Sequence, residues 1–208
     1  MRQAICRLGK RLVRRGFVSG SAGNISIRIP DGYLMTPTGA ALDRLCCDDL
    51  SHVAANGTHV AGSPPTKEAA LHRAVYEARE TANAVIHTHS THTVAVTLLP
   101  ELGDGDALPP LTPYYVMRVG RAPVVPYAPP GDPALAEAVG RRAAESRAIL
   151  LAHHGPVVAG NSLDDAADVL AELEETARLY LLVRGAPFRM LDAASVDALR
   201  VRPSGKGG

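Results

Sequence analysis

The apolar positions along the chain follow two different periods. Over residues 2–15 they recur at helical spacing among arginines and lysines, which predicts an amphipathic helix that ends at Gly16. From residue 25 to residue 29 apolar and polar side chains alternate, which predicts a half-buried strand, and a second strand is expected over 33–36 after a Pro-Asp-Gly turn. An Asn-Gly pair at 56–57 predicts a hairpin with a type I′ turn. The first third of the chain therefore indicates an antiparallel sheet.

From residue 66 onward, helical segments alternate with short apolar runs. Helices are expected over residues 66–79, 93–99, 133–144 and 162–184, with Thr66, Asp132 and either Asn161 or Ser162 as N-caps and with Pro133 at a first helical position. Buried strands are expected over residues 84–87, 149–154 and 156–159. This order predicts one α/β domain in layers over residues 1–202, whereas the low-complexity residues 203–208 are expected to form a disordered tail.

Composition narrows the classes of function. The chain has 208 residues and a formal net charge of +1, so it lacks the basic excess that favours nucleic acid or an anionic membrane surface. No apolar run approaches the roughly 18–20 residues that span a bilayer, and the N-terminus has no signal-peptide pattern. The three cysteines, Cys6, Cys46 and Cys47, are odd in number and two are adjacent, which argues against a disulfide framework. Cys46 and Cys47 could be metal ligands, but we favour partly buried thiols. We therefore expect a cytoplasmic protein that binds neither nucleic acid nor membranes.

The pair His87 and His89 is the sharpest chemical feature of the sequence. It follows an apolar run, and residues two apart in a strand face the same side, so both imidazoles could reach one metal ion. A third ligand could come from His153 or His154, at the end of another apolar run. Three histidines on an open tetrahedral site are typical of a catalytic zinc centre. The alternative is a set of surface histidines without a metal.

Glu68 is the candidate acid or base. It lies in the first turn of its expected helix, where the positive end of the helix dipole favours a carboxylate, although helix-start glutamates are also common without any catalytic role. His72, four residues on, lies on the same helix face and could orient Glu68; we favour a half-buried histidine with satisfied hydrogen bonds. No histidine precedes Glu68 in the pattern of a zinc protease, so a metalloprotease is poorly supported.

Two loops of small residues, 21–24 and 36–39, could cradle an anion. Both offer backbone N–H groups that no bulky side chain blocks, although glycine-rich turns are mostly only turns. Together with the helix start at Thr66 and Lys67, they suggest a phosphate site.

The order and spacing of these motifs resemble the class II aldolase and adducin family over about residues 4–185. The motifs are Ser21-Ala22-Gly23-Asn24-Ile25-Ser26, Thr36-Pro37-Thr38-Gly39, Lys67-Glu68, His87-Thr88-His89 and His153-His154-Gly155. The resemblance implies a single three-layer α/β/α domain with a mixed, mostly antiparallel central sheet. It also implies a homotetramer with its sites at subunit interfaces.

The same resemblance implies a zinc enzyme of the fuculose-phosphate aldolase and ribulose-phosphate epimerase type, with one Zn2+ per subunit. It assigns the zinc to His87, His89 and His154 and the acid/base role to Glu68. By the same carry-over, the substrate and its phosphate would contact Asn24, Thr38, Gly39, Thr66 and Lys67.

One departure from the aldolases narrows the expected substrate. Aldolases of the fuculose type carry Ser-Ser-Glu where this chain has Thr66-Lys67-Glu68, and this run, with the segments 109–120, 129–133 and 154–160, resembles the branch that decarboxylates 3-oxo-tetronate 4-phosphates. The implied products are dihydroxyacetone phosphate and CO2, formed through a metal-stabilised enediolate. Two alternatives stay open: cleavage of a ketose 1-phosphate by a class II aldolase, and an adducin-like interaction module without catalysis. Other divalent metals, such as manganese or cobalt, also remain open.

Overall fold

A single sheet of eight strands forms the middle of the molecule. In the computed structural model, which describes residues 1–100, 102 and 105–200, the strand order is β4-β3-β2-β1-β5-β8-β7-β6. The strands are β1 (Asn24–Ile29), β2 (Gly32–Met35), β3 (Ser51–Ala54), β4 (His59–Ala61), β5 (Ala84–His87), β6 (Val124–Val125), β7 (Ala148–Leu151) and β8 (Gly155–Gly160). Neighbouring strands are antiparallel except β6 and β7, which are parallel. The expected mixed, mostly antiparallel sheet is confirmed.

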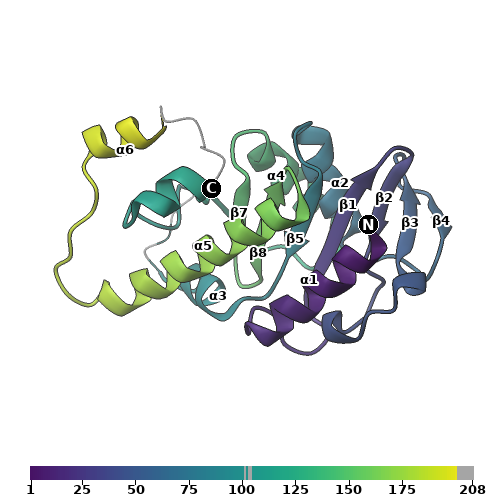
Figure 1. Cartoon of the computed structure of the whole chain (residues 1–208). Helices are drawn as coiled ribbons and strands as arrows, with labels where there is room; N and C mark the ends of the chain where they lie inside the picture. Colours follow the sequence, from purple (N-terminus) through teal and green to yellow (C-terminus); the bar gives the residue numbers. More distant parts are fainter. Residues whose placement is uncertain (101, 103–104, 201–208) are drawn as a thin grey trace, which may run out of the picture.

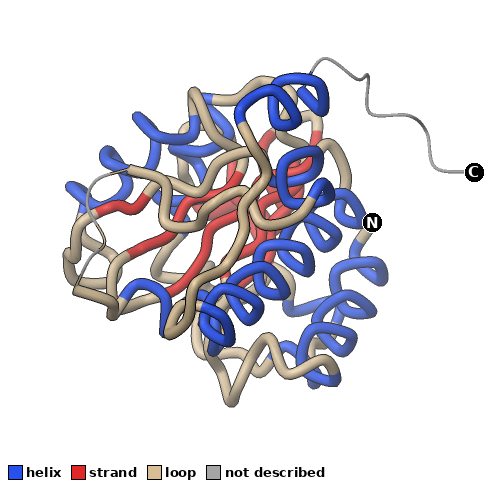
Figure 2. The backbone as a smooth tube through the Cα atoms, turned by 90° about the vertical axis from the view of Figure 1, so that its left-hand side faces the viewer, coloured by secondary structure: helices blue, strands red, loops and turns tan. Residues whose placement is uncertain are grey.

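Helices cover both faces of this sheet and complete the three layers. The α-helices are α1 (Arg2–Arg14), α2 (Ala69–Ala78), α3 (Thr91–Thr97), α4 (Pro133–Ala143), α5 (Leu163–Val183) and α6 (Ala193–Arg200). Two short 3-10 helices, Leu42–Arg44 and Cys47–Asp49, and one π-helical stretch, Tyr115–Val119, lie in the connections. Figure 1 shows α1 and α5 crossing in front of the strands, and Figure 2 shows the strands enclosed between helices.

The two faces carry separate apolar cores because strand side chains alternate between them. Ile25 and Ile27 of β1 pack with α1, α3 and α5 in the larger core. Val85 of β5 packs with α2 and α4 in the smaller one. The polar residues of β1 therefore point toward α2, and this arrangement places the chemistry described below.

Capping residues begin two helices where the sequence predicted. The Asp132 side chain accepts a hydrogen bond from Ala134 N (2.8 Å), with Pro133 at the first position of α4. The Ser162 hydroxyl accepts one from Asp165 N (3.1 Å) at the start of α5. Both side chains bind N–H groups that have no partner within the helix.

Four local predictions are wrong in detail. Helix α2 begins at Ala69 with Glu68 at its N-cap, because the chain at Thr66 pairs with a neighbouring loop instead of joining the helix. Strand β7 ends at Leu151, and residues 152–154 form a turn. In the β3–β4 hairpin only Gly57 has a positive φ (+93°), so the turn is not type I′, which needs two positive φ angles. Strand β1 is buried on both faces over residues 24–27 because α2 covers its polar side.

The predicted boundary at residue 202 and the predicted tail at 203–208 lie outside the described residues. Within the part of the chain that the structure describes, no helix is both long and apolar enough to cross a membrane.

Candidate active site

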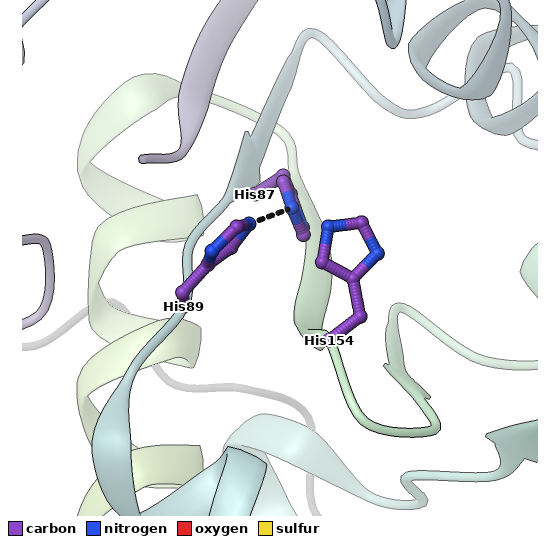
Figure 3. A group of neighbouring side chains, drawn as sticks. All are labelled: His87, His89 and His154. Carbon is purple, nitrogen blue, oxygen red and sulfur yellow. Dashed lines mark hydrogen bonds between the residues drawn. The ribbon is translucent and has the colours of Figure 1, made fainter. Parts of the chain in front are cut away.

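Three histidine rings converge at one edge of the sheet. His87 is the last residue of β5, His89 lies two residues further on, and His154 lies in the turn before β8, which pairs with β5. The Nε2 atoms of His87 and His89 are 3.1 Å apart, and one nitrogen from each of the three rings lies within 4.8 Å of the others. Figure 3 shows the three rings pointing toward one another. The predicted i, i+2 pair and the predicted third histidine are therefore brought together.

The orientation of His87 is set by its backbone surroundings. Its Nδ1–H donates to Pro156 O (2.9 Å), so the lone pair of a neutral ring lies on Nε2 and faces the other two histidines. Burial lowers the pKa of His87 to about 3, so the ring is neutral at neutral pH. Burial also lowers the pKa of His89. Neutral imidazoles with outer hydrogen bonds of this kind are the usual ligands of zinc.

Glu68 lies beside the histidines. Its side chain is 9% exposed; Oε2 lies 3.4 Å from His87 Nε2, and Oε1 lies 3.5 Å from His154 Nε2. Oε2 also accepts a hydrogen bond from Asn24 Nδ2 (2.8 Å), whereas Oε1 is buried and accepts none from the described residues. A buried carboxylate oxygen without a donor, next to three converging imidazole nitrogens, fits a bound cation.

The environment of Glu68 favours its charged form. Burial by itself would raise the pKa of the carboxyl, but His87, the Asn24 hydrogen bond and His154 act in the opposite direction, and the net pKa is lowered. Because burial keeps His87 neutral at neutral pH, the hydrogen bond from Asn24 is the contact that still favours the charged form of Glu68 at that pH. Glu68 is therefore a proton acceptor in the resting protein.

Two glycines allow the loops of the site to approach β5 closely. A Cβ at Gly23 would lie 2.8 Å from His87 O, and a Cβ at Gly155 would lie 2.2 Å from Thr88 O. Both residues also have positive φ angles, +77° and +146°. Only glycine fits such positions without a shift of the backbone. These contacts hold Asn24 and His154, which follow and precede the two glycines, against the end of β5.

The two candidate phosphate loops meet at one cleft. Ser21 and Gly39 line a cleft of about 340 Å³ together with Arg44. Some of the backbone donors expected there are already used: Thr38 N donates to Pro64 O (3.0 Å), and Thr66 N donates to Thr36 O (3.1 Å). Residues 36–38 therefore pair with residues 64–66, and the polar backbone groups of these two segments satisfy one another. The exposed groups of this region include Thr38, Gly39 and Lys67, whereas Thr66 is buried.

Two other sequence candidates lie away from the three histidines. The ring of His153 packs edge-on against Tyr127, with 6.0 Å between ring centroids, so His154 is the histidine that joins the cluster. Cys46 is exposed, contrary to our expectation of a partly buried thiol.

A buried chain of polar side chains behind Glu68 was not predicted from the sequence. Asn24 and Ser26 of β1 bind His72 on α2, and Ser26 also binds Tyr76. The signal was present in the spacing, because residues four apart lie on one helix face and Glu68, His72 and Tyr76 follow that spacing. The alternation of β1 predicts a half-buried strand with a solvent-facing polar side, and this pattern does not indicate a contact between Asn24, Ser26 and His72.

The chain is similar in sequence and in fold to known proteins. The family model described as "Class II Aldolase and Adducin N-terminal domain" matches residues 3–181. A 3-oxo-tetronate 4-phosphate decarboxylase from Cupriavidus necator is 50% identical over 197 residues, which cover 95% of this chain and 91% of the relative. The Escherichia coli protein of the same name is 43% identical, over 96% and 95% of the two chains. An L-fuculose phosphate aldolase from Haemophilus influenzae is 37% identical, over 82% and 77%.

Solved structures agree with this grouping. The crystal structure of YgbL from Escherichia coli superposes with a TM-score of 0.93 at 42% identity and covers 96% of this chain and 97% of that one. A structure of L-fuculose 1-phosphate aldolase has a TM-score of 0.86 at 26% identity, over 95% and 93% of the two chains. Family match, sequence identity and superposition all extend over most of the chain, and the protein therefore belongs to the class II aldolase and adducin family.

Proposed function

We propose that this protein is a metal-dependent carbon–carbon lyase that decarboxylates 3-oxo-tetronate 4-phosphate to dihydroxyacetone phosphate and CO2. The observation that carries the proposal is the convergence of His87, His89 and His154 beside Glu68. It is supported by relatives at 43–50% identity whose names state this decarboxylase activity. The fuculose phosphate aldolases of the same family are more distant, at 36–37% identity.

We assign the metal to the Nε2 atoms of His87, His89 and His154. Neutral imidazoles on an incomplete coordination sphere suit Zn2+, which we propose as the native ion, one per subunit. When bound, a divalent cation would act as a Lewis acid that favours the build-up of negative charge on the keto oxygen of the substrate.

Glu68 is the proposed acid/base residue. In the reaction the bond between C1 and C2 breaks and CO2 leaves. The electron pair of that bond stays on the substrate and moves toward the C3 oxygen. A proton must then reach C2 to complete dihydroxyacetone phosphate. Because Glu68 is a carboxylate in the resting protein, it must first accept the proton that it delivers. Oε1 is the atom suited to both steps, since it accepts no hydrogen bond within the described residues.

The proposed substrate contacts extend from the histidines to the loop cleft. Asn24 donates a hydrogen bond to Glu68, and we propose that it also contacts a substrate hydroxyl. We propose that Thr38 and Gly39 bind the phosphate at the cleft that Gly39 lines and that Thr66 supports this loop. The exposed ammonium group of Lys67, which precedes Glu68, would neutralise the substrate carboxylate or phosphate.

The proposal includes a cytoplasmic homotetramer with its sites at subunit interfaces. Large apolar side chains are exposed on the single chain, including Tyr114, Met117, Tyr127, Leu182 and Met190. Exposed apolar side chains of this size are common where subunits meet.

The test uses zinc-loaded protein and synthetic 3-oxo-tetronate 4-phosphate of both configurations at C2. Dihydroxyacetone phosphate is followed by coupled oxidation of NADH, and CO2 is measured in parallel. We expect both products at equal rates and their loss after chelation, with recovery on addition of Zn2+. If metal-replete protein forms neither product but cleaves a ketose 1-phosphate, the protein is an aldolase and the decarboxylase proposal is wrong.

A further inference from the structure

A chain of hydrogen bonds links Glu68 to the interior of the protein. Asn24 Nδ2 lies 2.8 Å from Glu68 Oε2, and the Asn24 Oδ1 atom is bonded to His72 Nε2. On the other side of the ring, His72 Nδ1 lies 2.6 Å from Ser26 Oγ, which lies 2.8 Å from the Tyr76 hydroxyl. The chain runs between β1 and α2 and ends at the proposed acid/base residue.

The directions of these bonds follow from the Asn24 amide, whose nitrogen lies 2.8 Å from Glu68 Oε2 and whose oxygen faces His72 Nε2. A carboxylate only accepts hydrogen bonds, so the amide nitrogen of Asn24 must face it and the amide oxygen must face His72. That oxygen is an acceptor, and therefore the Nε2 atom of His72 carries a proton. In a neutral imidazole the other nitrogen, Nδ1, then accepts from Ser26.

Burial makes this arrangement rigid. Ser26 and His72 are 0% exposed and Tyr76 is 1% exposed, so water does not compete for these bonds. Burial also lowers the pKa of His72 to about 4, which keeps the ring neutral at neutral pH. Without the proton on His72 Nε2, the Asn24 amide oxygen would lose its hydrogen-bond donor. The contact with His72 would then no longer favour the orientation in which the amide oxygen faces His72 and the amide nitrogen faces Glu68. A flipped amide would then present oxygen to the carboxylate of Glu68.

We infer that His72 is a positioning residue: it donates from Nε2 to Asn24, so that Asn24 holds Glu68 by Oε2 and leaves Oε1 for the reacting proton. This inference rests on the proposed function for the role of Glu68, but its structural part stands without the substrate. His72 is fully buried and touches neither the substrate cleft nor the histidine cluster in the described contacts.

The first test is spectroscopic and needs no turnover. In zinc-loaded protein labelled with 15N, long-range 1H–15N correlation distinguishes protonated from unprotonated ring nitrogens, and the signals of His72 are those that disappear in His72→Gln. We expect a neutral ring with its proton on Nε2. His87 provides an internal contrast, because its Nδ1 donates to Pro156 O and its ring should be the opposite tautomer. A proton on Nδ1 of His72, or on both nitrogens, would overturn the inference.

The second test compares two amides at position 72. Glutamine can place an amide N–H close to the position of Nε2. The shorter asparagine places its amide near the position of Nδ1 and does not reach Asn24. We expect His72→Gln to keep kcat within about threefold of the original protein and His72→Asn to lower it by about tenfold to 100-fold, with KM within about twofold in both. Metal content should stay at one ion per chain in both variants.

Tyr76→Phe is the matched control for general disturbance of this buried region. It removes the hydroxyl at the far end of the chain but leaves the His72–Asn24 bond, so we expect kcat within about threefold of the original value. Equal loss of kcat in His72→Gln and His72→Asn, or no loss in either, would show that His72 does not act through Asn24. If the original protein itself shows no decarboxylation, the proposed function fails, and the tautomer of His72 still decides the positioning inference.

Discussion

His153 and His154 are adjacent in the sequence, but their side chains lie in different surroundings. His154 Nε2 lies 3.5 Å from Glu68 Oε1 and its ring joins those of His87 and His89, whereas the ring of His153 packs against Tyr127. The backbone of His153 has a φ of +59°, an unusual value for a residue with a side chain, and this turn directs the two rings apart. Position 154, and not position 153, therefore supplies the third imidazole.

This difference predicts the effect of two matched substitutions on metal binding. We expect His154→Asn to lose stoichiometric zinc because one of three imidazole donors is removed, and His153→Asn to retain it, since asparagine also accepts a positive φ. Elemental analysis of the two purified proteins measures this directly. Full zinc in His154→Asn, or loss only in His153→Asn, would reassign the third ligand.

Glu68→Gln tests the acid/base assignment. The amide has nearly the same shape but cannot carry the proton, so we expect metal content to remain and kcat to fall by about 100-fold or more. Glu77→Gln is the control on the same helix, because Glu77 is exposed and pairs only with Arg73 in the described contacts. Turnover of Glu68→Gln near that of the original protein would remove Glu68 from the acid/base role.

The buried, neutral state of His72 predicts how stability depends on pH. Its pKa is lowered from 6.5 to about 4 in the folded protein, so below pH 6.5 the unfolded chain binds a proton that the folded chain does not. The stability that the neutral ring contributes is therefore fully present above the unfolded pKa and is lost as the pH falls from 6.5 toward 4. Within the fold Glu68 acts in the opposite direction on this pKa, but burial is the larger effect.

Urea unfolding of metal-free protein measures this dependence, with His72→Gln as the variant that does not titrate. Between about pH 7 and pH 5, the original protein should lose about 2 kcal/mol more unfolding free energy than the variant. Parallel loss of stability in the two proteins would show that the folded pKa of His72 is not lowered.

Local sequence patterns were enough to predict the elements and part of the site. The apolar run that ends at His87 and the two-residue spacing to His89 placed both rings on one side of the sheet edge. Asp132 and Ser162 begin their helices because capping depends on residues within one turn. Such features depend on near neighbours in the sequence and can be found without the fold.

Features that depend on distant segments could not be predicted in the same way. The alternation of β1 indicated one polar face, but only the packing of α2 shows that Asn24 and Ser26 are buried against His72. Likewise, the sequence does not show that the backbone N–H groups of Thr38 and Thr66 are bonded between the segments 36–38 and 64–66. In both cases polar groups separated by tens of residues satisfy one another, and sequence spacing does not report such partners.

Gly155 links the fold to the site, and its replacement should disturb both. An alanine Cβ there would lie 2.2 Å from Thr88 O, and the φ of +146° is unfavourable for any residue with a side chain. We expect Gly155→Ala to lower the unfolding free energy by about 3 kcal/mol and zinc affinity by about tenfold or more, since the turn that carries His154 must move away from β5.

Gly185→Ala is the control, because a Cβ at that position meets no atom within 4 Å. Urea unfolding and zinc competition with a chelating dye measure the two effects. Unchanged zinc affinity in a destabilised Gly155→Ala would show that the close approach to β5 serves the fold alone.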